Sequence, residues 1–251
     1  MNSKDFIIRI KYGGLGDHLF WSHLPRIAKT LGGYEKVYIS NYSDYRHPDY
    51  RKLVWELNPF VDGFCDEDGP YPEVVVPAGM NLLDSIMLAR GLDDGNRFHE
   101  PEIFYRPRVR AELASAQVFD PNYISNVGVF SNNKLISYLK KTGGVDYQMC
   151  VRGKCYGVQQ GVPILSSSDI FEYCDIIASC KSFLCLTSGG ATLASAIRKP
   201  AVVFYGYGQN PEHRHSKLHQ YVDVSLMFAR PLWRGNRLLR AAAAKILRRN
   251  R

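Results

Sequence analysis

Two segments of the chain combine a short apolar run, a glycine turn and a helical pattern, and this combination constrains the fold most. In the first, run 6–11 leads into Gly13-Gly14-Leu15-Gly16, after which apolar residues recur every three or four positions over 17–31. In the second, run 182–186 leads into Ser188-Gly189-Gly190 and a helix of small residues over 188–197. Strand, glycine turn and helix in this order are typical of βαβ units, so the sequence predicts an α/β fold with parallel sheets.

The remaining pattern predicts two halves of similar design. A proline- and charge-rich stretch over 93–121 is expected to be the crossover between them. We therefore expect Rossmann-like domains over 1–115 and 122–228, followed by a basic helix over 229–251. The other expected strands are 37–40, 63–65, 73–76, 127–130, 147–151, 162–165 and 201–205, and the other expected helices are 48–57, 134–141 and one beginning at Ser168 or Asp169.

Length and composition favour an ordinary globular protein. The 251 residues suffice for two compact domains, and 45% hydrophobic with 22% charged residues excludes a disordered or fibrous chain. No run approaches the roughly 20 apolar residues of a spanning helix, and the charged N-terminus does not resemble a signal peptide, so a cytoplasmic location is expected. The six cysteines form no Cys-x-x-Cys pair, which predicts reduced thiols and no zinc site.

The net charge of +8 is concentrated at the C-terminus. Eight basic residues and no acidic residue lie between Arg230 and Arg251. As a helix, this segment would place Leu238, Leu239 and Ile246 on one face and arginines on the other, a pattern typical of binding to an anionic membrane surface. A closing helix packed across both domains is the alternative. No aromatic platform accompanies the charge, so no nucleic-acid partner is expected.

The first glycine turn carries a candidate catalytic residue, Asp17. A dinucleotide site is disfavoured because the run lacks its third glycine at Leu19 and the second strand ends without an acid. Asp17 could instead accept a proton from an acceptor hydroxyl, or it could simply cap the helix. Gly14, Gly16 and His18 would then form the acceptor-side loop.

The second glycine turn is the candidate donor site. Its amides and hydroxyls suit a diphosphate, although close helix packing would also explain its small residues. Lys134, at a helix start where lysine opposes the dipole, is either a further anion ligand or a solvated surface residue. His213 and His215 are only weak evidence for a metal site. The residues expected to bind the donor are Lys134, Ser188, Gly189, Gly190, Ala191 and Thr192.

The segments 13–31 and 183–206 together resemble the heptosyltransferase-like glycosyltransferases of family 9, which have the GT-B fold. The family's Gly-Asp, with a proline eight residues after the Asp, matches Gly16, Asp17 and Pro25. The resemblance implies that Asp17 is the base, that Ser188 to Thr192 bind the donor phosphates, and that Lys134 is the family lysine. The chain departs from the family at Thr187 and Thr192, where the family has Asp and His.

The resemblance implies two Rossmann-like domains facing a cleft and an inverting transferase that needs neither metal nor cofactor. The expected partners are a nucleoside-diphosphate sugar and a glycan or lipid-linked acceptor of bacterial surface polysaccharide or lipopolysaccharide, used at the inner face of the cell membrane. The alternative is a non-catalytic scaffold of the same fold, and a sugar-nucleotide epimerase is a more distant one. The opening GGLG is also similar to fucosyltransferases that use GDP-fucose, whose later motifs are missing here.

Overall fold

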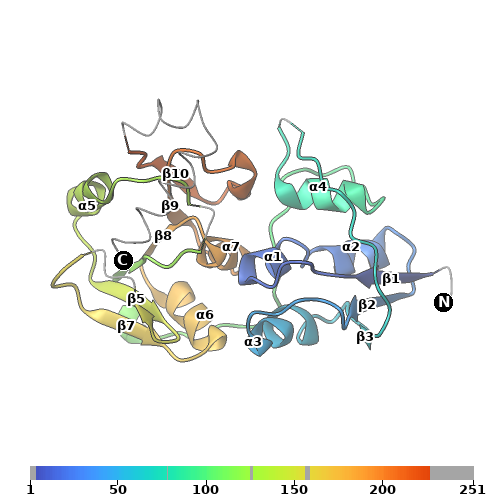
Figure 1. Ribbon diagram of the computed structural model, residues 1–251. Coiled ribbons are helices and arrows are strands. Elements are labelled where there is room, and N and C mark those ends of the chain that lie inside the picture. Colours follow the sequence, from blue (N-terminus) through green and yellow to red (C-terminus); the bar gives the residue numbers. More distant parts are fainter. Residues whose placement is uncertain (1–3, 78, 125–126, 156–158, 227–251) are drawn as a thin grey trace.

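The computed structural model describes residues 4–77, 79–124, 127–155 and 159–226 and contains two β-sheets (Figure 1). The first sheet is three-stranded, has the order β1-β2-β3 and is parallel throughout. Its strands are β1 (Asp5–Ile8), β2 (Lys36–Ser40) and β3 (Gly63–Cys65). The helices of this half are α1 (Leu15–Leu19), α2 (Leu24–Thr30), α3 (Pro48–Arg51) with its π-helical continuation (Lys52–Glu56), and α4 (Leu82–Ala89).

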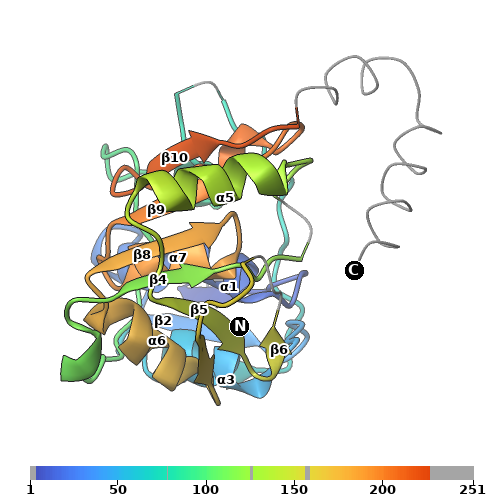
Figure 2. The same cartoon turned by 90° about the vertical axis from the view of Figure 1, so that its left-hand side faces the viewer.

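The second sheet is seven-stranded, with the order β10-β9-β8-β4-β5-β6 and with β7 also paired to β5. All its pairs are parallel except β5 with β6 (Figure 2). Its strands are β4 (Gln117–Asp120), β5 (Tyr147–Val151), β6 (Lys154–Cys155), β7 (Ile164–Ser167), β8 (Ser182–Leu186), β9 (Ala201–Tyr205) and β10 (Gln220–Asp223). The helices are α5 (Asn132–Lys141), α6 (Ile170–Ser179) and α7 (Gly189–Ala196), and short 3₁₀ turns lie at Ala111–Leu113 and Pro211–His213.

Alternate residues of the second sheet face two different layers, as the two-residue period of a strand requires. In β8, Phe183 and Cys185 join the cluster that contains α6 and α7, whereas Leu184 and Leu186 pack with α5. The α6 and α7 cluster continues without a break into the core of the first half, through Leu15, Leu19 and Trp55. The two halves therefore share one hydrophobic core, which fixes the loops at their junction.

The single helix expected over 17–31 is divided into α1 and α2. Pro25 lies in the first turn of α2, where its missing N–H costs nothing. Ser22 lies in the intervening turn, where its Oγ donates to the Leu19 carbonyl at 2.7 Å and accepts from the Glu102 amide at 2.8 Å. The apolar spacing alone predicts a helix that runs through this turn, so the expected helix over 17–31 was too long.

Two expected strands do not form in the described residues, and three strands, β4, β6 and β10, were not expected. The segment around 73–76 is flanked by Pro72 and Pro77, which cannot donate to a ladder, and it forms no strand. The segment 127–130 makes only single bridges, to Tyr207 and Ser225, because Gly128 adopts a φ of 79° against the Gly206 backbone. The second sheet instead has β4 in its interior, within the expected crossover and before residue 122.

Three further expectations concern the cysteines, membrane-spanning helices and the C-terminal segment. Cys65, Cys174, Cys180 and Cys185 are free, but Cys150 is disulfide-bonded, so the expectation that all six thiols are reduced is wrong there. No helix within the described ranges has the length and hydrophobicity to cross a membrane. The expected basic helix over 229–251 lies outside the described residues.

Candidate functional site

The two glycine turns predicted from sequence meet at the junction of the halves. Helix α1 packs against α7 with Gly16 opposite Gly189 (Figure 1). A Cβ on Gly189 would lie only 3.1 Å from the Gly16 nitrogen, and a Cβ on Gly16 would lie 3.6 Å from Thr192 Oγ1. The contact at Gly189 is tight, so the lack of a side chain there lets the two helix N-termini approach one another, whereas a Cβ on Gly16 would make an ordinary contact.

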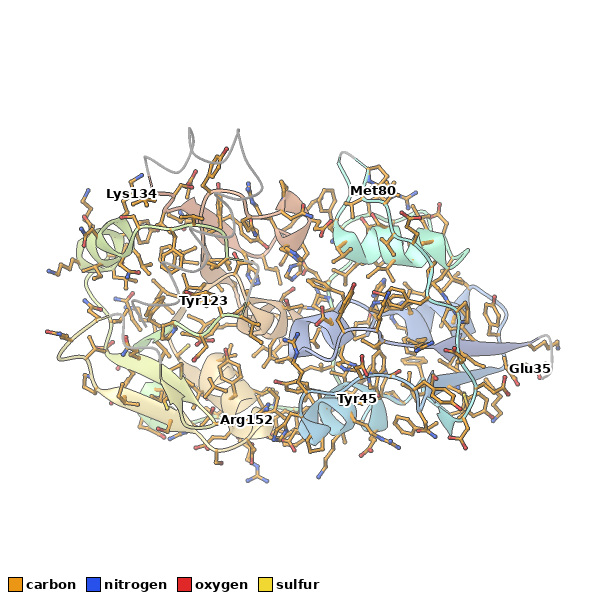
Figure 3. All side chains as sticks on the ribbon, viewed as in Figure 1. Glu35, Tyr45, Met80, Tyr123, Lys134 and Arg152 are labelled. Atoms are coloured by element: carbon orange, nitrogen blue, oxygen red, sulfur yellow. The ribbon has the colours of Figure 1, made fainter. Side chains whose placement is uncertain are left out.

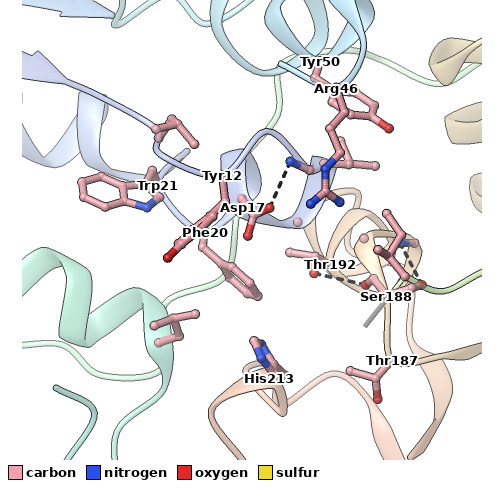
Figure 4. Close-up of a pocket in the computed structure, with 18 of the residues that line it drawn as sticks. Tyr12, Asp17, Phe20, Trp21, Arg46, Tyr50, Thr187, Ser188, Thr192 and His213 are labelled. Carbon is pink, nitrogen blue, oxygen red and sulfur yellow. Dashed lines mark hydrogen bonds between the residues drawn. The ribbon is translucent and has the colours of Figure 1, made fainter. Parts of the chain in front are cut away.

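A cavity of about 920 Å³ opens beside these turns and is lined by both halves (Figure 4). This volume is within the range of small-molecule sites. The first half contributes Lys11, Tyr12, Gly14, Gly16, Asp17, Phe20, Trp21, Arg46, Tyr50 and Tyr71, among others. The second half contributes Asp120, Asn122, Tyr123, Arg152, Tyr173, Thr187, Ser188, Gly189, Gly190, Thr192 and His213, among others.

Asp17 lies in the first turn of α1, and its carboxylate lines the cavity. Its Oδ2 accepts from the Gly14 amide at 3.0 Å, as in a capping box (Figure 4). Burial raises the pKa of the Asp17 carboxyl, while the Gly14 amide and the charge of Arg46 oppose that rise. The hydrogen bond uses one carboxylate oxygen, so Asp17 can cap the helix and still accept a proton on the other.

An aromatic wall borders Asp17 on the first half. Trp21 stacks on Tyr71, with ring centroids 5.5 Å apart, and Tyr12 meets Tyr71 edge-on at 6.5 Å. Lys11 places its Nζ 5.7 Å from the Tyr71 centroid. Tyr12 keeps 56% of its surface exposed, so this wall offers an accessible, mixed apolar and cationic face to a ligand.

The second glycine turn forms the N-terminus of α7. Ser188 is the N-cap, and its Oγ accepts from the Gly190 amide at 3.2 Å. Thr192 directs its Oγ1 back to the Ser188 carbonyl at 3.4 Å. Ala191 is buried and is not among the lining residues, and its carbonyl accepts from His219 Nε2 at 2.9 Å. Ser188, Gly189, Gly190 and Thr192 thus face the cavity, whereas Ala191 supports them from behind.

Sequence reasoning missed a buried carboxylate in this end of the cavity, Asp120. The Tyr173 hydroxyl donates to Asp120 Oδ2, and Asn122 donates its backbone amide to Oδ1 at 2.9 Å. Burial raises the pKa values of both Asp120 and Tyr173. Asp120 ends β4, so recognising that strand would have placed the acid at the ligand-binding edge of the sheet.

His18 and Lys134 were expected at the site, and the structure brings neither into the cavity. His18 is fully buried between Trp55, which donates to its Nδ1 at 3.0 Å, and the Asp44 carbonyl, 2.9 Å from Nε2. Burial lowers the pKa of His18 to about 4, so the ring is neutral. Lys134 donates from Nζ to the Ser225 carbonyl at 2.8 Å, at the outer side of the second half (Figure 3).

His213 lines the cavity, whereas His215 is buried. The His213 ring stacks on Phe20 with centroids 6.2 Å apart, and burial lowers its pKa. His215 meets the edge of the same Phe20 ring at 5.1 Å. Within the described part of the chain, no cluster of three or more His, Cys, Asp or Glu side chains could hold a metal ion.

No family model matches the sequence, and no curated protein matches it. Solved structures do match the fold. The glycosyltransferase family 9 protein of Veillonella parvula superposes with a TM-score of 0.60 and 9% identity, over 91% of this chain and 88% of that one. The Escherichia coli ADP-heptose lipopolysaccharide heptosyltransferase II gives a TM-score of 0.56 and 12% identity, over 99% and 100%.

A third structure is the dodecameric iron-containing heptosyltransferase TibC in complex with ADP-D-β-D-heptose. It gives a TM-score of 0.61 and 18% identity, over 86% of this chain and 62% of TibC, so the chain spans less than two thirds of that protein. The predicted resemblance and the predicted α/β class are thereby confirmed in the fold. The chain has the GT-B-like, two-sheet fold of the family 9 glycosyltransferases.

Proposed function

We propose that the chain is an inverting glycosyltransferase that moves a sugar from a nucleoside-diphosphate donor to a glycan or lipid-linked acceptor. The observation that carries this proposal is that Asp17 and the Ser188–Gly190 turn, one from each half, line the same cavity, in a fold shared with heptosyltransferases. The first half, 1–115, would bind the acceptor, and the second half, 122–228 together with β4, would bind the donor.

Asp17 is the proposed general base. An acceptor hydroxyl beside it would lose its proton to the free carboxylate oxygen as the hydroxyl oxygen attacks the anomeric carbon. The bond between that carbon and the diphosphate oxygen breaks on the opposite face, which inverts the configuration. The raised pKa of Asp17 supports this role, because a more basic carboxylate is a better proton acceptor near neutral pH.

The N-terminus of α7 is the proposed site of the donor diphosphate. Its backbone amides and the Ser188 and Thr192 hydroxyls would hold the phosphate oxygens, and the helix dipole favours their charge. These groups would stabilise the leaving diphosphate, and we propose that no metal ion or organic cofactor is needed. TibC, solved with ADP-D-β-D-heptose, is the neighbour whose ligand supports a nucleotide-sugar donor.

The proposed setting is the inner face of the bacterial cell membrane, in surface-polysaccharide or lipopolysaccharide synthesis. The basic sequence from Arg230 to Arg251 supports attraction to an anionic membrane. Flotation with vesicles that contain phosphatidylglycerol, compared with neutral vesicles, tests this part separately. Binding to both kinds of vesicle, or to neither, would contradict it.

A non-catalytic scaffold is the second candidate, because the departures from the family fall on the donor side. Thr187 and Thr192 replace the family's Asp and His, and Lys134 is bonded to Ser225 instead of lining the cavity. A scaffold would bind no donor.

A thermal-shift panel of ADP, GDP, UDP, CDP and their sugars tests the proposal. A donor site predicts a shift of several degrees for one nucleoside diphosphate, by binding linkage. Asp17→Asn should keep that thermal shift, because the amide oxygen can still accept from Gly14. Its turnover should fall about 10²–10⁴-fold, because an amide cannot accept the proton. Unchanged turnover would refute the role of Asp17, and no shift with any nucleotide would favour the scaffold.

A further inference from the structure

The proposed diphosphate site lacks its expected cation. Lys134 lies on the outer side of the second half, with its Nζ bonded to the Ser225 carbonyl (Figure 3). The buried carboxylate of Asp120 lies in the same end of the cavity and would be 2.7 Å from a Cβ on Gly190. A diphosphate at the start of α7 would therefore lie beside a negative group, so another cation is required to balance its charge.

Arg152 lines the same cavity as the start of α7. It directly follows β5, whose neighbour β4 ends at Asp120, and β4 in turn neighbours β8, which leads into Ser188. The carboxyl ends of these parallel strands form one edge, where α/β sheets bind ligands. Among the described lining residues of the second half, Arg152 is the sole lysine or arginine.

The Arg152 side chain is held in the cavity without full use of its donors. Its guanidinium carbon lies 4.9 Å from the ring centroid of Tyr50, a residue of α3 in the first half. Its Nε is buried and has no hydrogen-bond partner in the described structure. A buried donor that bonds to nothing is costly, and a bound anion would satisfy it.

The backbone position of Arg152 is set by a tight turn. Arg152 and Gly153 are the two residues between β5 and β6, which pair antiparallel, and their φ values of 51° and 71° are those that a two-residue hairpin turn requires. This turn fixes the backbone of Arg152 at the carboxyl end of β5.

We infer that Arg152 binds the diphosphate of the donor, in the role expected of Lys134. This inference rests on the proposed function and specifies its donor site. The planar guanidinium can form two parallel hydrogen bonds to phosphate oxygens, and it would leave the Tyr50 ring or slide along it to do so. The ligand class is a nucleoside diphosphate or its sugar.

Calorimetric titration of the full chain with the nucleoside diphosphate that shifts its melting temperature provides the test. Arg152→Ala should weaken Kd tenfold or more, and Arg152→Lys should restore only part of the loss because lysine lacks the fork. Lys134→Ala removes the same charge outside the cavity and should bind within twofold of the wild type. Arg152→Gly should lose affinity as alanine does, with Tm unchanged or raised, because glycine relieves the left-handed backbone.

The outcomes separate this inference from the proposed function. If the wild type binds and both Arg152→Ala and Arg152→Gly keep its Kd, the assignment of Arg152 is overturned while the proposed donor site stands. An equal loss for Lys134→Ala would also overturn it, since the effect would then follow net charge. If the wild type binds none of the nucleotides, the proposed donor site is overturned, and the assignment of Arg152 is overturned with it.

Discussion

The Tyr173 hydroxyl lies directly beneath Gly190, so a Cβ on that glycine would overlap it. The same Cβ would lie 2.7 Å from Asp120 Oδ2. Tyr173 and Asp120 are both buried and bonded to each other, so neither can move without breaking that pair. The glycine thus allows the start of α7 to rest on a buried polar pair.

Gly190→Ala should therefore lower the free energy of unfolding by about 1–3 kcal/mol, the usual cost of overpacking. Gly16→Ala is the matched control, because its Cβ would meet Gly189 and Thr192 at an ordinary 3.6 Å. Urea denaturation of both variants measures the difference. Equal stability of the two variants would show that Tyr173 moves aside freely.

The activity should depend on pH through Asp17. An ionised carboxylate is required to accept the proton, so kcat/KM should fall as pH falls through the raised pKa of Asp17. Arg46 favours the ionised form, so Arg46→Gln should move this acid limb to higher pH. Arg51→Gln is the control, because Arg51 pairs with Glu56 at 3.0 Å and does not line the cavity.

pH–rate profiles of the wild type, Arg46→Gln and Arg51→Gln test this prediction. An acid limb that stays in place in Arg46→Gln, or that moves equally in Arg51→Gln, would show that Arg46 does not act on the base through its local charge.

His18 should make stability fall in acid. Its folded pKa of about 4 lies below the unfolded value of about 6.5, so between these values the unfolded chain binds a proton that the native protein does not. The free energy of unfolding should thus fall by about 1.4 kcal/mol per pH unit as pH drops across this window, from this group alone.

His18→Gln should flatten that slope. Its amide can accept from Trp55 and donate to the Asp44 carbonyl, the two bonds that the imidazole makes, but it does not titrate. Denaturant melts at pH 7, 6 and 5 provide the measurement. The slope that remains would come from other buried histidines, and a slope identical to that of the wild type would contradict the assignment.

Restoring the family's aspartate at position 187 should destabilise this chain. Thr187 donates from Oγ1 to the Phe204 carbonyl at 3.1 Å and is buried. A carboxylate has no proton to donate and would repel that carbonyl, so Thr187→Asp should cost about 1–3 kcal/mol. Thr187→Ser keeps the donor and should stay close to the wild type. Thermal melts of the two variants test this, and a stabilised Thr187→Asp would contradict it.

Much of the fold could be predicted from the sequence because the signals are local. The run 182–186, the Ser188 cap and the run 201–205 formed as strand, turn and strand where the apolar pattern and the glycines predicted them. The same local signals predicted a site at the turns that contain Asp17 and Ser188, and both turns line the cavity. By contrast, β4 has only two apolar residues, and its place inside the sheet depends on strands that come later in the chain.

Tertiary structure alone decided which residues of the candidate site come together. A motif names a residue, but the direction of its side chain depends on partners distant in sequence. Lys134 turns toward Ser225, and His18 is enclosed by Trp55. Asp120, which no motif marked, and Arg152 reach the cavity because parallel strands bring their carboxyl ends to one edge. The sequence thus determined the local elements and the glycine turns, whereas the packing of two sheets determined the charges that face a ligand.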